Sequence, residues 1–82
     1  AHVPCSVSRE HVMAYMEVHQ SALKTYDAIA RALQRDEAGD PQLPYWLMTL
    51  NFGRHNSGAI VTWCKETLKE LERLEGTKKR RQ

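Results

Sequence analysis

The stretch Asp36-Glu37-Ala38-Gly39-Asp40-Pro41 divides the 82-residue chain into two long segments with helical patterns. Gly39 and Pro41 together form a strong helix stop, and Asp40 can cap the segment that follows. Because the break is only a few residues long, the two segments are expected to pack antiparallel to each other. The stretch therefore predicts a helical hairpin.

The first segment has the pattern of an amphipathic helix over about residues 9–36. Ser8 is the expected N-cap, and Glu10 lies in the first turn, where the helix dipole favours an anion. Polar and charged residues, including Glu17, Lys24 and Arg31, are expected on the solvated face. Apolar residues recur at steps of mostly three and four, the period of one helical face. The apolar stripe comprises Val12, Tyr15, Met16, Ala22, Leu23, Tyr26, Ile29, Ala30 and Leu33, with His19 on the same stripe.

The second segment predicts a helix over about residues 44–75, with Pro44 as the first helical residue and the end just before Gly76. Residues 77–82 form a basic tail that is expected to be disordered and solvated. The apolar positions of this helix point in several directions around its axis. They are Trp46, Leu47, Leu50, Phe52, Ile60, Val61, Trp63, Cys64, Leu68, Leu71 and Leu74.

Two antiparallel helices cannot enclose a core, because each apolar stripe touches only one neighbour. The sequence therefore predicts an all-α fold in which the long two-helix hairpin pairs with a copy of itself into a dimeric four-helix bundle. Residues 1–76 would form this dimerisation domain. The residues expected to pack the dimer interface are Leu47, Leu50, Val61, Trp63, Leu68 and Leu71.

Composition and charge exclude several classes of protein. The chain is 41% hydrophobic and 27% charged, and it contains no apolar run long enough for a membrane span. Residues 1–76 carry eight basic and ten acidic residues, a net charge of −2, so the folded body is not expected to bind DNA by itself. Cys5 and Cys64 are 59 positions apart and are expected to be free thiols. A cytoplasmic location is the default expectation.

No motif for catalysis is present, so an enzyme is not expected. The sequence has no Gly-rich phosphate loop, no Gly-x-Ser-x-Gly and no His-Glu-x-x-His. Met16 and His19 are one turn apart and are soft or imidazole ligands, but a Met at helical spacing is more often core filler than a ligand of copper or haem. No metal or cofactor is predicted. Arg54 is expected to form a solvated or interfacial salt bridge.

Two glycines interrupt the second helix at positions 53 and 58, and each costs about 1 kcal/mol relative to Ala. A close helix crossing or a kink would explain them, since small residues let backbones approach. Aromatic side chains near such a crossing could bind a flat organic ligand, although plain core packing is the alternative for each of them. The candidate ligand-binding residues are Tyr15, Met16, His19, Trp46, Phe52 and Trp63.

The chain resembles the C-terminal domain of the PadR family of transcriptional regulators over about residues 6–75. The similarity is carried by Leu50-Asn51-Phe52-Gly53-Arg54-His55 and by the segment from Ile60 to Leu68 that contains Trp63. Ser8-Arg9-Glu10 leading into a long helix and the turn at Asp40-Pro41 also agree with the family pattern. The order and spacing of these features carry the resemblance, since none of them is diagnostic alone.

This resemblance implies a dimerisation and effector-sensing domain, with a small aromatic or planar compound as effector. Such regulators read DNA through an N-terminal winged helix-turn-helix that these 82 residues do not contain. DNA contact is therefore expected only through that additional domain, and the chain is expected to be part of a longer regulator or a partial form of one. The alternative is a helical adaptor or chaperone that offers its groove to a partner helix.

Overall fold

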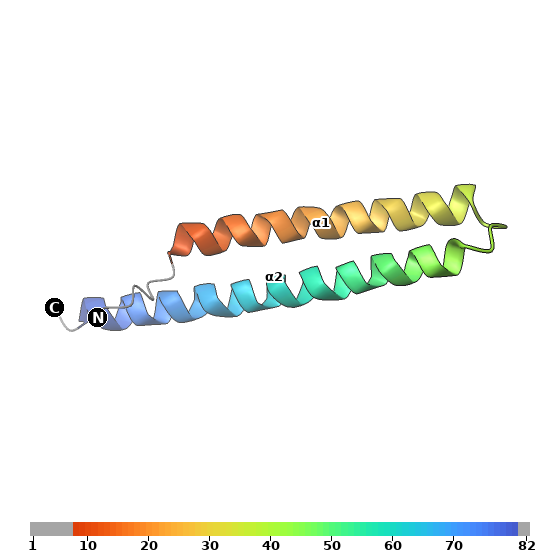
Figure 1. The fold of residues 1–82 in the computed structure, drawn as a ribbon. Helices are drawn as coiled ribbons and strands as arrows, with labels where there is room; N and C mark the ends of the chain where they lie inside the picture. Colours follow the sequence, from red (N-terminus) through yellow and green to blue (C-terminus); the bar gives the residue numbers. More distant parts are fainter. Residues whose placement is uncertain (1–7, 81–82) are drawn as a thin grey trace, which may run out of the picture.

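The structure, a computed structural model, describes the backbone of residues 8–80 and the side chains of residues 8–76. It contains two α-helices, α1 (Arg9–Asp36) and α2 (Leu43–Arg80). The helices lie antiparallel and side by side, and a short connection joins them at one end (Figure 1). The predicted all-α helical hairpin is confirmed.

Local interactions at the helix ends explain where α1 begins and where the chain turns. The His11 N–H donates a 3.4 Å hydrogen bond to Ser8 Oγ, which confirms Ser8 as the N-cap. At the other end, the Glu37 N–H donates to the Leu33 carbonyl at 2.8 Å. Asp40 Oδ1 then accepts a 2.7 Å hydrogen bond from the Gln42 N–H, just before α2 begins. Side chains thus satisfy backbone groups that helix ends leave unpaired.

The far end of α2 differs from the sequence-based expectation. The helix continues through Gly76 to Arg80, beyond the end predicted at about residue 75. A single Gly costs a helix about 1 kcal/mol, and no Pro follows to stop it. Within the expected tail, residues 81–82 lie outside the described residues, as does Cys5.

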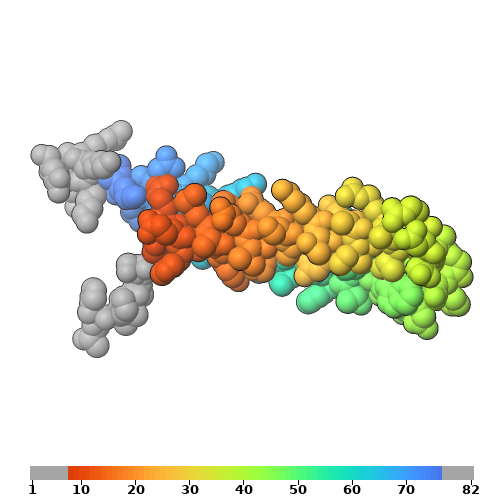
Figure 2. Space-filling view, turned by 90° about the horizontal axis from the view of Figure 1, so that it is seen from above, coloured from red at the N-terminus to blue at the C-terminus, as the bar shows by residue number. Residues whose placement is uncertain are grey.

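The hairpin is long and thin. Its principal dimensions are 65 × 27 × 14 Å, so its shortest dimension is close to the diameter of one helix with its side chains, about 10–12 Å. Figure 2 shows α1 lying along α2 as an extended rod with no third layer over the residues drawn in colour. Each helix therefore has one neighbour, and most of its circumference faces solvent.

Candidate functional site: the seam and the two sides of the hairpin

The seam between the two helices has a small core. Among the described side chains, only Val12, Ser57, Val61 and Cys64 are buried. Cys64 is a free thiol with no exposed surface, as expected for this cysteine. A fully buried core in a larger domain would have many more such residues. This hairpin leaves most of its apolar side chains only half-covered.

A polar contact crosses the centre of the seam. His19 Nδ1 of α1 and Ser57 Oγ of α2 share a 3.0 Å hydrogen bond, and Ser57 is only 2% exposed. The Tyr15 ring packs edge-on against the His19 ring, with a centroid separation of 4.7 Å and an interplanar angle of 79°. The sequence placed His19 on the apolar stripe but did not predict a role for Ser57. An isolated Ser within a polar stretch gives no signal of burial.

The two glycines of α2 have different surroundings. A Cβ added at Gly53 would lie 2.8 Å from Tyr26 Cζ, so the Tyr26 ring occupies the space that a side chain would need. This contact confirms the predicted close approach at Gly53. Nothing lies within 4 Å of a Cβ added at Gly58, so the same explanation is wrong for that position. Gly58 lies to one side of the seam, where no part of α1 packs against it.

The residues predicted for a dimer interface lie in two environments. Val61 is 8% exposed, and four leucines are half-buried, so all five are largely covered within the single hairpin. Trp63 differs, because it is 49% exposed. The predicted role of the six residues in a dimer stays a prediction. The half-buried leucines are Leu47, Leu50, Leu68 and Leu71.

One side of the hairpin carries a second set of apolar residues that α1 and α2 do not cover. On α1 this row contains Tyr15, Val18 and Ile29, which are 47%, 62% and 41% exposed. On α2 it contains Phe52 and Trp63, which are 74% and 49% exposed. Tyr15 and Trp63 line one apolar groove of about 330 Å³ with His11 and Val12, which shows that the two rows lie on the same side. We call this side the apolar face. Helical spacing from Tyr15 and Trp63 adds the other residues of the two rows to it, some of them polar or half-buried, and the full set is Tyr15, Val18, Ala22, Thr25, Ile29, Tyr45, Thr49, Phe52, Asn56, Ile60, Trp63, Thr67 and Leu74.

The candidate ligand-binding residues are not all brought together. Tyr15 and Trp63 share the groove, and His19 contacts Tyr15 beneath it. Met16 is half-buried on the seam row. Trp46 precedes Trp63 by 17 residues, about 26 Å along a helix, so it cannot line the same groove. Phe52 is also separated from this groove, by about 16 Å along α2.

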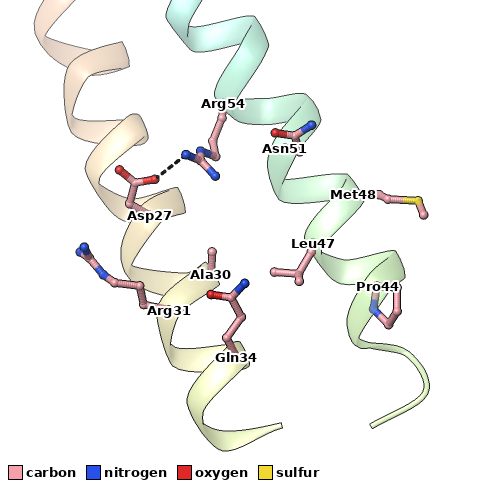
Figure 3. A pocket seen from close by; sticks show the side chains of 9 residues that line it. All are labelled: Asp27, Ala30, Arg31, Gln34, Pro44, Leu47, Met48, Asn51 and Arg54. Carbon is pink, nitrogen blue, oxygen red and sulfur yellow. Dashed lines mark ion pairs between the residues drawn. The ribbon is translucent and has the colours of Figure 1, made fainter. Parts of the chain in front are cut away.

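The opposite side of the hairpin combines charged residues with apolar ones such as Met48, which is 64% exposed. Arg54 Nη2 of α2 lies 3.2 Å from Asp27 Oδ1 of α1, and both side chains are 48% exposed, which confirms the expected solvated salt bridge. A shallow hollow of about 620 Å³ surrounds the pair (Figure 3). Arg31 and Gln34 of α1 line it, and Leu47 of α2 points from its own helix toward α1 (Figure 3). We call this side the charged flank.

Two further features concern the part of the chain that the structure describes. No helix in residues 8–80 is long and apolar enough to cross a membrane. No three His, Cys, Asp or Glu residues gather into a metal-binding group within that part of the chain.

Comparison with known proteins identifies the family. No curated protein and no solved structure gives a significant match to the chain. A family model described as "Virulence activator alpha C-term" matches residues 1–72, which include all of α1 and most of α2. Since this match spans most of the 82 residues, the chain belongs to the virulence activator alpha C-terminal family.

Proposed function

We propose that this chain is the dimerisation and effector-sensing module of a PadR-like transcriptional regulator. Its membership of the virulence activator alpha C-terminal family supports a module associated with a regulator. The resemblance of residues 50–68 to PadR C-terminal domains supports the finer assignment. The module would have no catalytic role and would act by holding two subunits at a defined separation.

The observation that carries the proposal is the small core. Only four described side chains are buried in a rod 65 Å long, whereas large aromatic residues such as Phe52 and Trp63 remain exposed. Monomeric soluble proteins rarely expose contiguous apolar patches larger than a few hundred Å². Pairing with another hairpin would complete a four-helix bundle and give these residues a partner.

Regulation would follow from the geometry of such a bundle. A winged-helix domain attached before α1 would be positioned by the bundle, and two such heads would read half-sites about 34 Å apart. An effector that favours one crossing angle of the hairpins would shift the population of DNA-binding dimers. The groove at Tyr15 and Trp63 is the best candidate effector site, because it is apolar and joins both helices.

Two experiments test the proposal. Sequencing the coding region upstream is expected to reveal a winged helix-turn-helix in frame with Ala1. Light scattering of the 82-residue chain at micromolar concentration is expected to give twice the mass of one chain. A monomer under these conditions would refute the proposed dimerisation.

Effector sensing has a separate test. A thermal-shift screen with aromatic acids and planar cations is expected to find compounds that stabilise the chain, since a ligand that binds only the folded state raises its melting temperature. The stabilisation should be lost in Trp63→Ala, measured at a concentration at which light scattering shows that this variant is still a dimer, because Trp63 also lies on the exposed apolar side of the hairpin. A hit that stabilises Trp63→Ala equally would place the effector elsewhere than in the groove.

A further inference from the structure

We infer that the apolar face is the docking site for a second copy of this chain, and that the seam residues are not. The inference rests on the proposed dimerisation and assigns it to one side of the hairpin. From the sequence, residues such as Val61 and Leu68 are predicted for the dimer interface. This inference instead places Val18, Phe52 and Trp63 at the centre of the interface. Four observations support this assignment.

The first observation is the spacing of the apolar face. In α1, the row Tyr15, Val18, Ala22, Thr25 and Ile29 alternates steps of three and four residues. This is the spacing of residues that pack one helix against another. The row runs beside the other apolar row of α1, which contains Val12 and already packs on α2. In α2, Tyr45, Thr49, Phe52, Asn56, Ile60, Trp63 and Thr67 likewise recur at steps of three and four. Each helix therefore has two packing rows, and the hairpin uses one of them.

The second observation is the separation of charge. The rows of the apolar face contain no acid, Lys or Arg between His11 and Leu33 in α1, or between Tyr45 and Thr67 in α2, and only beyond Thr67 does the α2 row pass through an acid, Glu70, before it reaches Leu74. The charged residues of these segments lie elsewhere, as Asp27 and Arg54 do on the opposite side. A two-fold interface brings the same patch of both copies together, so an uncharged patch avoids burying like charges against each other.

The third observation concerns the polar atoms on the face. Thr25 Oγ1 donates to the Ser21 carbonyl at 3.1 Å, and Thr49 Oγ1 donates to the Tyr45 carbonyl at 3.2 Å. Because these donors are satisfied within their own helices, burying the two threonines leaves no hydroxyl hydrogen unpaired. Asn56 is the one amide in the α2 row, and a second copy would have to supply its partner.

The fourth observation is the area available. A large apolar side chain offers roughly 200 Å² when fully exposed, so the exposed fractions of the large side chains on this face amount to about 750 Å² per copy. A stable protein interface buries about 800 Å² per partner. The face is thus large enough for a second copy. The side chains counted are Tyr15, Val18, Ile29, Tyr45, Phe52, Trp63 and Leu74.

The test compares matched substitutions on α1. Val18→Lys adds a charge to the apolar face, whereas Met13→Lys adds the same charge one and a half turns away, beside Glu10 and Glu17. Both positions are exposed in the hairpin, at 62% for Val18 and 44% for Met13. In sedimentation equilibrium of the 82-residue chain, Val18→Lys is expected to raise the dimer dissociation constant at least about tenfold, and Met13→Lys less than about twofold.

A second measurement does not depend on how Val18→Lys folds. With Trp46→Phe as background, Trp63 is the only tryptophan, and iodide quenching of its fluorescence reports its exposure. Quenching is expected to fall as the chain concentration rises through the dimer dissociation constant. Circular dichroism at the same concentrations would show whether helix content changes as well.

The outcomes separate this inference from the proposed function. A chain that is monomeric throughout would overturn both. A dimer that Met13→Lys weakens as much as Val18→Lys does would overturn the assignment of the face and leave dimerisation standing. A dimer in which Trp63 stays equally open to iodide would overturn the assignment in the same way. A folded monomer that gains mass only with a different protein would overturn the second copy as the occupant of the apolar face.

Discussion

At the scale of single residues, the seam combines apolar packing with one polar contact that fixes alignment. The His19–Ser57 hydrogen bond can form in only one relative position of the two helices, whereas Val, Leu and Cys side chains tolerate a shift. Ser57 is buried, so a hairpin displaced by one turn would leave its hydroxyl without a partner. The His19–Ser57 pair therefore fixes the relative alignment of α1 and α2 along their axes.

Removing both members of this pair is expected to cost less than the sum of the two single losses. Ser57→Ala should destabilise the fold by about 1 kcal/mol, because the half-buried His19 imidazole loses its partner. The double variant His19→Leu with Ser57→Ala should lose less than the sum of the single losses. Urea denaturation at one fixed protein concentration measures the cycle. Losses that add within about 0.3 kcal/mol would show that the hydrogen bond does not couple the helices.

A second residue-scale prediction concerns Glu70 and Arg73, one turn apart on α2. The side-chain hydrogen bonds from Arg73, of which the shortest is 2.6 Å, lower the pKa of the Glu70 carboxyl, and the same contact raises the pKa of Arg73. The stability that this contact contributes is present above the unfolded pKa of Glu70 and is lost as the pH falls through its lower folded pKa.

Both groups are exposed, so solvent screens the pair, and the titration should be easier to detect than any change in melting temperature. Arg73→Gln is expected to return the pKa of Glu70 toward its ordinary value in a carbon-detected NMR titration. Lys69→Gln, which leaves the contact in place, provides the control. An unchanged Glu70 titration in Arg73→Gln would contradict the assigned cause.

At the scale of the elements, the start of α1 and the break between the helices follow from local chemistry, whereas the far end of α2 and the contacts between the helices do not. Ser8 begins α1, and the break at residues 37–42 ends it, as the sequence indicates. The rotation of α2 relative to α1 depends instead on contacts between distant residues. The Gly53–Tyr26 approach is one of them, since any side chain at position 53 would have to displace the Tyr26 ring.

The two glycines of α2 should therefore respond differently to alanine. Gly58→Ala is expected to raise the free energy of unfolding by about 0.5–1 kcal/mol, because the site is open and Ala favours a helix. Gly53→Ala should raise the free energy of unfolding by less than Gly58→Ala does, or should lower it, because the added Cβ would meet the Tyr26 ring. Thermal denaturation of the two variants side by side measures the difference. Equal stabilisation would mean that Tyr26 moves aside without cost.

Gly58→Ala also tests whether residues 53–58 provide flexibility in a longer regulator of the kind proposed above. If Gly58 provides flexibility, Gly58→Ala should weaken the response of DNA binding to effector without weakening DNA binding itself. A response identical to that of the original protein would assign Gly58 no part in switching. Fluorescence anisotropy with labelled operator DNA would measure both quantities.

At the scale of the whole molecule, the dominant property is a thin rod with an exposed apolar face along one side. A shortest dimension of 14 Å leaves no interior away from the seam, so stability must come from outside the single hairpin or remain low. The charged flank, with Asp27 and Arg54 half-exposed, suits solvent and keeps the rod from stacking on that side. If two copies pair through the apolar side, each copy uses the same surface, and the charged side is left facing solvent. Such pairing closes after two copies and does not extend into an open filament.

This shape predicts a melting temperature that depends on protein concentration. If folding and dimerisation are coupled, a hundredfold increase in protein concentration stabilises the folded dimer by about 2.7 kcal/mol. This should raise the melting temperature by roughly 5–10 °C. Circular dichroism in cells of different path length measures this shift. The Val18→Lys variant should melt at a lower temperature than the original chain at every concentration. A melting temperature that is constant over the same range would indicate a hairpin that is stable alone.

The sequence by itself determined the two helices, their caps, the break between them and the presence of more apolar surface than one partner helix could cover. These follow from short-range rules of capping and periodicity, which involve residues close together in the chain. Only the tertiary structure decided which apolar row of each helix faces the other. Both rows have helical spacing, so periodicity cannot separate Val61 on the seam from Trp63 on the apolar face. Two contacts between distant residues favour the observed rotation of α2 relative to α1. The hydrogen bond with His19 gives the buried Ser57 hydroxyl a partner, and Gly53 leaves room for the Tyr26 ring.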